Sequence, residues 1–352
     1  MSARQPLAPW QQRIHDHAAD ALDAGRLGHG LLFCGPAQLG KRAVAERLAE
    51  RVLCLQRSAG EGPCGRCRSC HLLAQRHQRD PVETRPDGQL AHPLGHSGHP
   101  DLVLVGHVLN EKGRPPKMRS EIVIEQVRNL SEKLALTTQY GGAQVVIIDP
   151  ADAVNHAACN ALLKTLEEPV PGRYLWLVSG NPARLPATIR SRCQRLEFRL
   201  PPREESLQWL QAQGHDSGDA LEALEAAHGH PGQADAWLRN EGMGLRRQVG
   251  TDLDAIAQGT RTPLETAQRW TADEHAALRL RHAADLAVAR AAERLTDPAR
   301  TRSLAAWFDQ ANRTCELLRT TVRADLAVLE LLMAWRSGAA RSEARSRPDG
   351  AG

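Results

Sequence analysis

Four cysteines lie close together at a spacing that is typical of a metal site. They read C-x9-C-x2-C-x2-C on a glycine-containing stretch and are Cys54, Cys64, Cys67 and Cys70. Four thiolates suit a closed, structural zinc ion, because a tetrahedral set of four sulfur ligands leaves no position open for water. The alternatives are disulfides, independent free thiols, or His71 as a substitute ligand. The clustering favours zinc.

A second motif is of the kind that binds phosphate. Residues 35–41 read GPAQLGK, the G-x-x-x-x-G-K part of a phosphate-binding loop, between an apolar strand at 30–34 and a predicted helix at 42–52. Glycines let backbone N–H groups turn toward phosphate oxygens, and the lysine adds a positive charge. A glycine-rich turn without a ligand is the alternative. The positions expected to contact nucleotide are Gly35, Gly40 and Lys41.

The residue after Lys41 departs from the motif. The pattern requires a Ser or Thr whose hydroxyl holds Mg²⁺, and this chain has Arg42 instead. The sequence therefore leaves ATP binding by this loop in doubt, although weak binding through Lys41 and the loop amides is an open alternative.

The elements that position these residues follow from the hydrophobic pattern. Two apolar runs, 145–149 and 174–179, predict buried strands of a parallel sheet, and the first ends in Asp149. Small and apolar residues at helical spacing lie between them, and Pro169 ends that helix. The pattern also predicts a strand at 101–105 and helices at 9–24 and 122–136. Residues 76–100 indicate a surface loop, in which His92, His96 and His99 are alternative metal ligands.

After residue 202 the pattern is helical. Segments 203–213, 220–228 and 231–240 predict a small helical unit, and longer Ala/Leu/Arg segments follow at 262–295, broken near Thr271, and at 301–336. The last residues, 337–352, are small and charged, so we expect a disordered tail.

Composition restricts the classes of function. The 352 residues carry 45 Lys and Arg against 41 Asp and Glu, so the net charge of +4 does not identify a nucleic-acid-binding protein. Only 3% of residues are aromatic, which argues against extensive base stacking. A zinc-finger nucleic-acid binder is a further alternative, but the cysteines have only arginines and no aromatic residue beside them. No apolar run approaches the ~20 residues that span a bilayer. We expect a cytoplasmic protein without a membrane role, with cysteines free or metal-bound.

Residues 145–195 resemble the clamp-loader branch of the AAA+ ATPases. The segments NALLKTLEEP and LPATIRSRCQ carry the resemblance, and the tripeptide Ser191-Arg192-Cys193 is the signature of that branch. The resemblance extends over about residues 9–335. It implies an α/β AAA+ (P-loop) domain with a parallel sheet and an inserted zinc module at residues 1–200. A helical lid at 201–244 and an all-α collar for oligomerisation at 245–336 would follow.

The resemblance also exposes two further departures. Asp149 matches the acid that orients the metal, but Pro150 stands where active members carry the glutamate that polarises water, and proline cannot act as a base. The segment 229–233 reads GHPGQ and lacks the arginine that active members direct at phosphates. Together with Arg42, these losses predict a subunit without ATPase activity of its own. A catalytically active loader ATPase is the alternative.

The resemblance implies that Arg192 acts on the nucleotide of a neighbouring subunit. Arginine suits this role because its planar guanidinium donates two hydrogen bonds to phosphate oxygens. An internal ion pair with Glu167 or Glu197 is the alternative. The implied partners are the gamma/tau-type ATPase and delta subunits, and through the complex the sliding clamp and primed DNA. The implied enzyme is a DNA-directed DNA polymerase (nucleotidyltransferase) holoenzyme.

Overall fold

The structure is a computed structural model of the 352-residue chain. It describes residues 6–58, 60–78, 82–83, 90, 95–110, 117–135, 137–140, 142–292, 297–318 and 320–346. The chain divides into two compact units, Met1–Trp209 and Leu210–Gly352. This boundary lies inside a helix and close to the predicted end of the α/β domain.

The first unit is built around a five-stranded, fully parallel sheet in the order β4-β7-β8-β1-β9. Four of these strands coincide with the runs predicted from sequence, and β9 was not predicted. Three of its four residues, QRLE, are exposed and two of them are charged, as is common for an edge strand. The strands are β1 (Gly30–Cys34), β4 (Leu102–Val105), β7 (Gln144–Ile148), β8 (Arg173–Ser179) and β9 (Gln194–Glu197).

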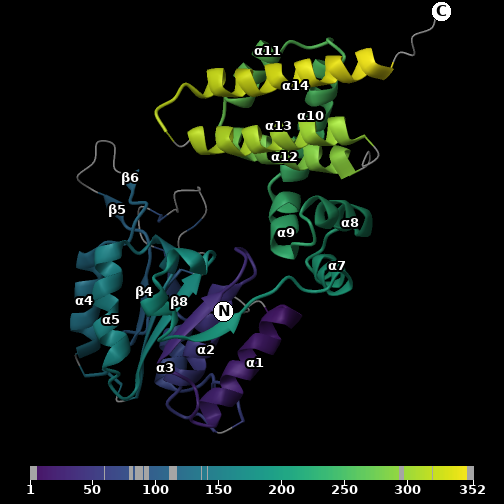
Figure 1. The fold of residues 1–352 in the computed structure, drawn as a ribbon. Helices are drawn as coiled ribbons and strands as arrows, with labels where there is room; N and C mark the ends of the chain where they lie inside the picture. The colour runs from purple at the N-terminus through teal and green to yellow at the C-terminus, as the bar shows by residue number, and fades with distance from the viewer. Residues whose placement is uncertain are drawn as a thin grey trace, which may run out of the picture. The chain divides into compact units, whose positions relative to one another are not determined.

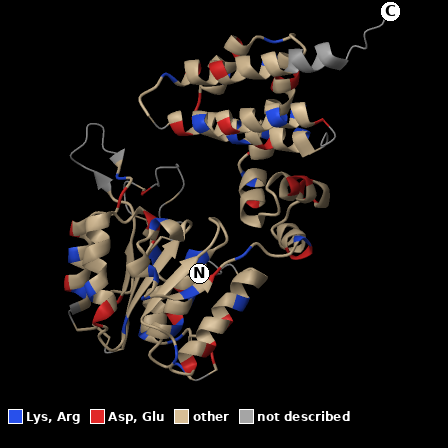
Figure 2. Ribbon diagram, in the orientation of Figure 1, with Lys and Arg blue, Asp and Glu red and all other residues tan. Residues whose placement is uncertain are grey.

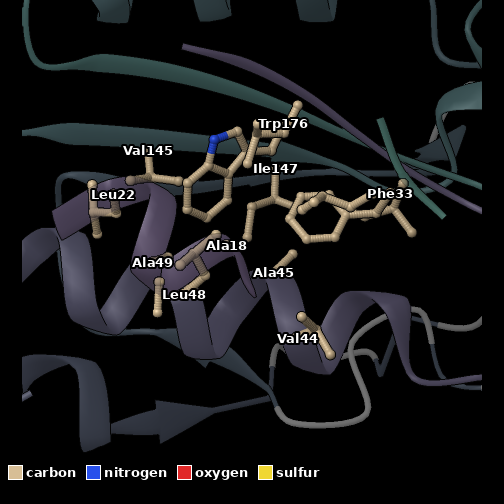
Figure 3. Packing of buried hydrophobic residues seen from close by; sticks show 14 of the residues in the cluster. Ala18, Leu22, Phe33, Val44, Ala45, Leu48, Ala49, Val145, Ile147 and Trp176 are labelled. Atoms are coloured by element: carbon tan, nitrogen blue, oxygen red, sulfur yellow. The ribbon is translucent and has the colours of Figure 1, made fainter. Parts of the chain in front are cut away.

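The sheet is buried on both faces, which explains why its central strands are apolar throughout. Alternate residues of one strand enter different cores. In β1, Leu31 and Phe33 belong to one buried cluster, and Leu32 and Cys34 belong to the other. Figure 3 shows the first cluster, in which Phe33 and Trp176 from the sheet pack over alanines of the helices beneath.

Helices cover the two faces (Figure 1). The first three helices contribute to the cluster of Phe33, and the next three to the cluster of Leu32. Their bounds are α1 (Pro9–Asp23), α2 (Lys41–Leu53), α3 (Arg68–Ala74), α4 (Ile124–Ala135), α5 (His156–Glu167) and α6 (Ala187–Arg190). Two short 3₁₀ turns, η1 (Ala151–Ala153) and η2 (Pro182–Arg184), and two antiparallel pairs complete the described elements. The pairs are β2 (Arg76–His77) with β3 (His96–Ser97), and β5 (Leu109–Asn110) with β6 (Lys117–Met118).

This arrangement confirms the predicted fold class. A parallel sheet carries the glycine-rich loop between β1 and α2, and the four-cysteine insertion follows α2. It is the α/β P-loop architecture of AAA+ domains, followed by a helical C-terminal part.

Among the residues that the structure describes, the regular elements of the second unit are all helices. α7 (Arg203–Ala212) crosses the boundary, and the last five helices share a core that includes Trp270, Trp307 and Trp335. The helices of this core are α10 (Gly242–Ala257), α11 (Pro263–Trp270), α12 (Ala276–Ala292), α13 (Pro298–Leu317) and α14 (Ala324–Ser346), and two shorter helices, α8 (Ser217–Ala226) and α9 (Pro231–Arg239), precede them. The predicted break near Thr271 is confirmed. The finer division into a lid and a collar stays a prediction.

The single helix predicted at 301–336 is wrong, because the chain turns between α13 and α14. Thr320 donates its hydroxyl to the carbonyl oxygen of Leu317 at 2.7 Å and so closes the end of α13. Thr320, Thr321 and Val322 are β-branched, which disfavours helix continuation. At its other end α14 continues to Ser346, past Arg336, where the ordered chain was expected to end. The Ala- and Arg-rich residues after 336 favour propagation of a helix that has already formed.

Acidic and basic residues are interspersed along the elements of both units (Figure 2). Within the described ranges, no helix is both long and apolar enough to cross a bilayer.

Candidate functional site

The glycine-rich loop has a backbone that only glycine accommodates at two positions. Gly35 has φ of 136° and Gly40 has φ of 79°, both in the region that disfavours other residues. A Cβ atom on Gly35 would lie 2.1 Å from the carbonyl oxygen of Phe198, and one on Gly40 would lie 2.1 Å from Nε2 of Gln11. The loop is therefore a built structure and not a chance glycine-rich turn.

Two side chains at the start of α1 hold the glycine-rich loop by hydrogen bonds. Nε1 of Trp10 and Nε2 of Gln11 each donate a hydrogen bond to the carbonyl oxygen of Leu39, at 3.2 Å. Sequence reasoning missed both residues as part of this site, because the contacts join positions 29 and 28 residues apart and no local pattern marks them.

Lys41 is buried at the first turn of α2. Its Nζ donates to the carbonyl oxygen of Gly35 at 2.9 Å and to that of Pro36. The ammonium group that the motif provides for phosphate is thus held against the loop itself.

Arg42 and Asp149 lie together, as the sequence motif predicts for these two positions, but they form an ion pair. Nη1 of Arg42 is 3.6 Å from Oδ2 of Asp149, and both side chains are largely buried. In P-loop NTPases a Ser or Thr hydroxyl and a carboxylate at these two positions hold Mg²⁺. Here the carboxylate faces a guanidinium.

The other two departures are visible in the structure as well. Pro150 precedes the turn η1 and offers no side chain that can accept a proton. In the second unit, His230 caps α9, because its Nδ1 accepts a hydrogen bond from the backbone N–H of Gln233 at 3.1 Å. The GHPGQ segment therefore starts a helix and carries no guanidinium.

The four cysteines converge as predicted. The sulfur atoms of Cys54, Cys64, Cys67 and Cys70 all lie within 4.8 Å of one another, and those of Cys64 and Cys70 are 3.9 Å apart. A tetrahedral zinc site with Zn–S bonds of about 2.3 Å places its sulfur atoms roughly 3.8 Å apart. The size of the cluster therefore fits a zinc ion.

Backbone N–H groups donate hydrogen bonds to the cysteine sulfur atoms, which stabilises the negatively charged thiolate form. The amides of Cys64, Cys67 and Cys70 donate to the sulfur atoms of Cys54, Cys64 and Cys67 at 3.3, 3.3 and 3.4 Å. A hydrogen bond from the Arg66 backbone lowers the pKa of Cys64 to about 6. Burial, followed by the neighbouring Cys67 thiol, raises the pKa of Cys70. Four thiols so close cannot all ionise without a cation, and a divalent metal supplies that charge.

Hydrogen bonds join the segment that carries the four cysteines, residues 54–76 (the cysteine segment), to the sheet. Ser69, fully buried between two of the cysteines, donates to the carbonyl oxygen of Leu53 at 2.6 Å, and its hydroxyl lies 2.8 Å from Nε2 of His99. Nδ1 of His99 accepts from the backbone N–H of Asp101 at 3.1 Å, directly before β4. The cysteine segment is therefore braced against the sheet edge.

The histidines were wrongly expected to be solvated. His99 is 2% exposed, and burial lowers its pKa. His96 is 9% exposed and lies 2.6 Å from Oε2 of Glu83. His92 lies outside the described residues. The polar composition of residues 76–100 does not show which histidines find partners in the fold.

Arg192 follows the short helix α6. Its Nη2 is 2.7 Å from Oε1 of Glu167, and its Nη1 donates to the carbonyl oxygen of Thr188 at 3.0 Å. The alternative partner, Glu197, pairs with Arg199 at 2.7 Å. About a third of the Arg192 side chain is exposed, so its guanidinium is oriented and also accessible.

The amino-acid sequence matches one known protein family over the part of the chain that carries these features. The family model described as DNA polymerase III, delta subunit, matches residues 10–202, more than half of the chain. The chain belongs to this family. The match covers the glycine-rich loop, the cysteine cluster and Arg192, and it confirms the resemblance to clamp-loader subunits.

The relatives include the DNA polymerase III subunits delta' of three bacteria. The Pseudomonas aeruginosa protein is 36% identical over 251 residues, 71% of this chain and 66% of that protein. The Haemophilus influenzae protein is 33% identical over 226 residues, 64% of this chain and 59% of that protein. The Escherichia coli protein is 32% identical over 243 residues, 68% of this chain and 64% of that protein. The matched part thus spans 59% to 66% of these relatives.

Solved structures show a more distant similarity. A gamma-subunit-related protein of Thermotoga maritima aligns with a TM-score of 0.43 at 15% identity, covering 92% of this chain and 99% of that one.

Proposed function

We propose that this chain is the delta' subunit of a bacterial DNA polymerase III clamp loader, the assembly that places the sliding clamp on primed DNA during chromosomal replication. Its family and the delta' relatives support this function. Its direct partners would be gamma/tau-type ATPase subunits and a delta subunit, and its compartment the cytoplasm, where bacterial chromosomes replicate.

Within that complex, the chain hydrolyses no ATP. The observation that carries this part of the proposal is the ion pair between Arg42 and Asp149. Magnesium neutralises charge on the transferred phosphate in P-loop enzymes, and the protein must present oxygen ligands to hold it. An arginine in place of the hydroxyl removes one ligand and opposes the metal by its charge.

The chain lends Arg192 to a neighbouring subunit. The exposure of its guanidinium and its two contacts, to Glu167 and Thr188, support this role, since an oriented arginine loses little freedom on meeting a phosphate. The Glu167 pair is partly exposed, and pairs of this kind contribute only about 0.2–1 kcal/mol. Exchange of the carboxylate for a phosphate group is therefore inexpensive.

The zinc ion has a structural role. Cys54, Cys64, Cys67 and Cys70 would hold it, and a closed set of four thiolates leaves no position for a reacting water. The bound ion would neutralise the thiolates and brace the insertion, which Ser69 and His99 join to the sheet.

Reconstitution tests the proposed function. The chain is mixed with gamma/tau-type and delta subunits of a related loader, and the complex is isolated by gel filtration. Clamp loading on primed DNA is then compared with and without the chain. We expect a stoichiometric complex whose loading depends on the chain. A chain that forms no complex and leaves loading unchanged would exclude the delta' function.

The alternative is an ATPase subunit of the same ring. The tau subunit of Escherichia coli is 28% identical over 190 residues, 54% of this chain and 24% of that protein, so the relationship extends to both kinds of subunit. The residues at positions 42 and 150 favour the inactive subunit.

A further inference from the structure

An ion network lies on the buried face of α2. Glu46 and Glu50 are 2% and 4% exposed, although an isolated buried carboxylate is strongly unfavourable. Oε1 of Glu46 accepts a hydrogen bond from Nε of Arg42 at 2.8 Å, and Oε2 accepts one from Nη1 of Arg76 at 2.7 Å. Two arginines from different segments therefore share one buried carboxylate.

Arg76 comes from the end of the cysteine segment. It follows α3, the helix that contains Cys70, and its Nε donates to the carbonyl oxygen of Leu73 at 3.1 Å. Its Nη2 lies 3.7 Å from Oε1 of Glu50. The guanidinium thus spans two carboxylates of α2 and is anchored to the backbone of the cysteine segment.

The network continues to the nucleotide site through Arg42. The same guanidinium that binds Glu46 through Nε approaches Asp149 through Nη1. Nη1 of Arg47 lies 3.9 Å from Oε2 of Glu50, at the end of the network away from Asp149. The guanidinium of Arg42 therefore lies against Asp149 in the position where a P-loop enzyme would hold a divalent cation.

We propose that Arg76 is a positioning residue for the degenerate nucleotide site: it completes the network that holds Arg42 on Asp149 as a resident cation, and so the cysteine segment helps to exclude Mg²⁺–nucleotide. Without Arg76, Glu46 keeps Arg42 as its nearest partner and draws the guanidinium toward itself. Asp149 is then released to bind a metal ion. The inference rests on the proposed function in one respect: it assumes that this site does not hydrolyse ATP.

Binding of ADP to the full chain, measured by calorimetry with and without Mg²⁺, tests this role. In the unaltered chain Mg²⁺ does not tighten ADP binding. In Arg42→Thr, which removes the cation and restores a hydroxyl, Mg²⁺ tightens it by about 5-fold or more, the lower end of usual coupling between two ligands. Arg76→Gln gains a smaller enhancement in the same direction. The matched control Arg47→Gln removes the same charge from α2 but leaves the pairs of Glu46 with Arg42 and Arg76 in place, so it behaves as the unaltered chain.

A further variant separates positioning from general loss of stability. Glu46→Gln removes the carboxylate that competes with Asp149 for Arg42, so Arg42 stays on Asp149 and Mg²⁺ still gives no enhancement. Simple destabilisation would affect Glu46→Gln and Arg76→Gln alike. If Arg76→Gln does not fold, Arg76→Lys takes its place with the same expected direction, because one ammonium group does not span both carboxylates.

Two results overturn the proposal: Mg²⁺ tightens ADP binding in the unaltered chain, or Arg76→Gln gains no more than Arg47→Gln. ADP binding is measured on the chain alone. The role of Arg76 is therefore tested even if the chain does not assemble with loader subunits.

Discussion

The hydroxyl of Ser69 lies 2.8 Å from Nε2 of His99, across 30 residues of sequence, and this contact joins the cysteine segment to the start of β4. Ser69 lies between Cys67 and Cys70, and Asp101, next in the chain of hydrogen bonds, directly precedes the strand. The cysteine segment is therefore part of the core structure of the α/β unit and not a loosely attached loop.

Replacing Ser69 by Ala should destabilise the α/β unit. The substitution removes the bond to Leu53 and leaves buried groups of His99 without this partner, which costs about 1–3 kcal/mol. Chemical unfolding of the two proteins measures the difference. Ser337→Ala is the control, because its exposed hydroxyl donates to the carbonyl oxygen of Met333 within the same helix. Equal effects of the two substitutions would contradict the bracing role.

We expect about one zinc ion per chain, with Zn–S distances near 2.3 Å. Elemental analysis and X-ray absorption of protein purified without chelator measure both quantities. Cys67→Ser should release the metal and lower the melting temperature, because binding free energy contributes to folding in such sites. Cys315→Ser, which lies outside the cluster, should retain it. A folded, metal-free protein would refute the assignment.

The stability of the second unit should fall in acid because of His282. Burial first, and then Arg246 and Arg281, lower the pKa of this fully buried histidine to about 4. The unfolded chain, with the ordinary pKa near 6.5, then binds more protons below that value, so the contribution is present above pH 6.5 and is lost toward pH 4.

Between pH 7.5 and 5 this loss amounts to about 2 kcal/mol. Unfolding at the two pH values should show a smaller difference in His282→Gln than in the unaltered chain. His275→Gln, at an exposed position nearby in sequence, should change nothing. An unchanged pH profile in His282→Gln would show that this histidine does not carry the effect.

The isolated chain should hydrolyse no ATP. Arg42 opposes the metal, and no base stands at Pro150. A phosphate-release assay on the purified chain measures the rate, and Lys41→Ala serves as the control for contaminating enzymes. Turnover above background that disappears in Lys41→Ala would show that the site is active.

Local sequence patterns predicted most strands and both motifs, but they did not predict contacts between residues far apart in the sequence. The strand, loop and helix around Gly35 and the spacing of the four cysteines are encoded within a few neighbouring residues, so both motifs were found. Arg76, whose partner Glu46 is 30 residues away, and Gln11, which supports the loop, carry no such signal. The turn after α13 was missed because β-branched residues lower helix propensity only slightly, and the apolar pattern continues past them at Leu326 and Leu329.

Arg192 also combines a local sequence signature with a partner that lies far away. Its signature is local, but the nucleotide that it would contact belongs to another chain. Its contacts to Glu167 and Thr188 hold it in an exposed position, and the pair with Glu167 was one of the alternatives that the sequence left open. A variant therefore has to be studied in the assembled loader.

The most direct measurement is the ATPase rate of the reconstituted loader with Arg192→Ala, in the presence of clamp and primed DNA. Arginines supplied across an interface accelerate well-studied GTPases by roughly 10³–10⁵, so we expect an assembled complex whose hydrolysis at the adjoining site is largely lost. Arg199→Ala, which removes an exposed arginine from the same region, is the control and should keep the full rate. A loader that assembles with Arg192→Ala and retains the same ATPase and clamp-loading rates as the control would contradict the account.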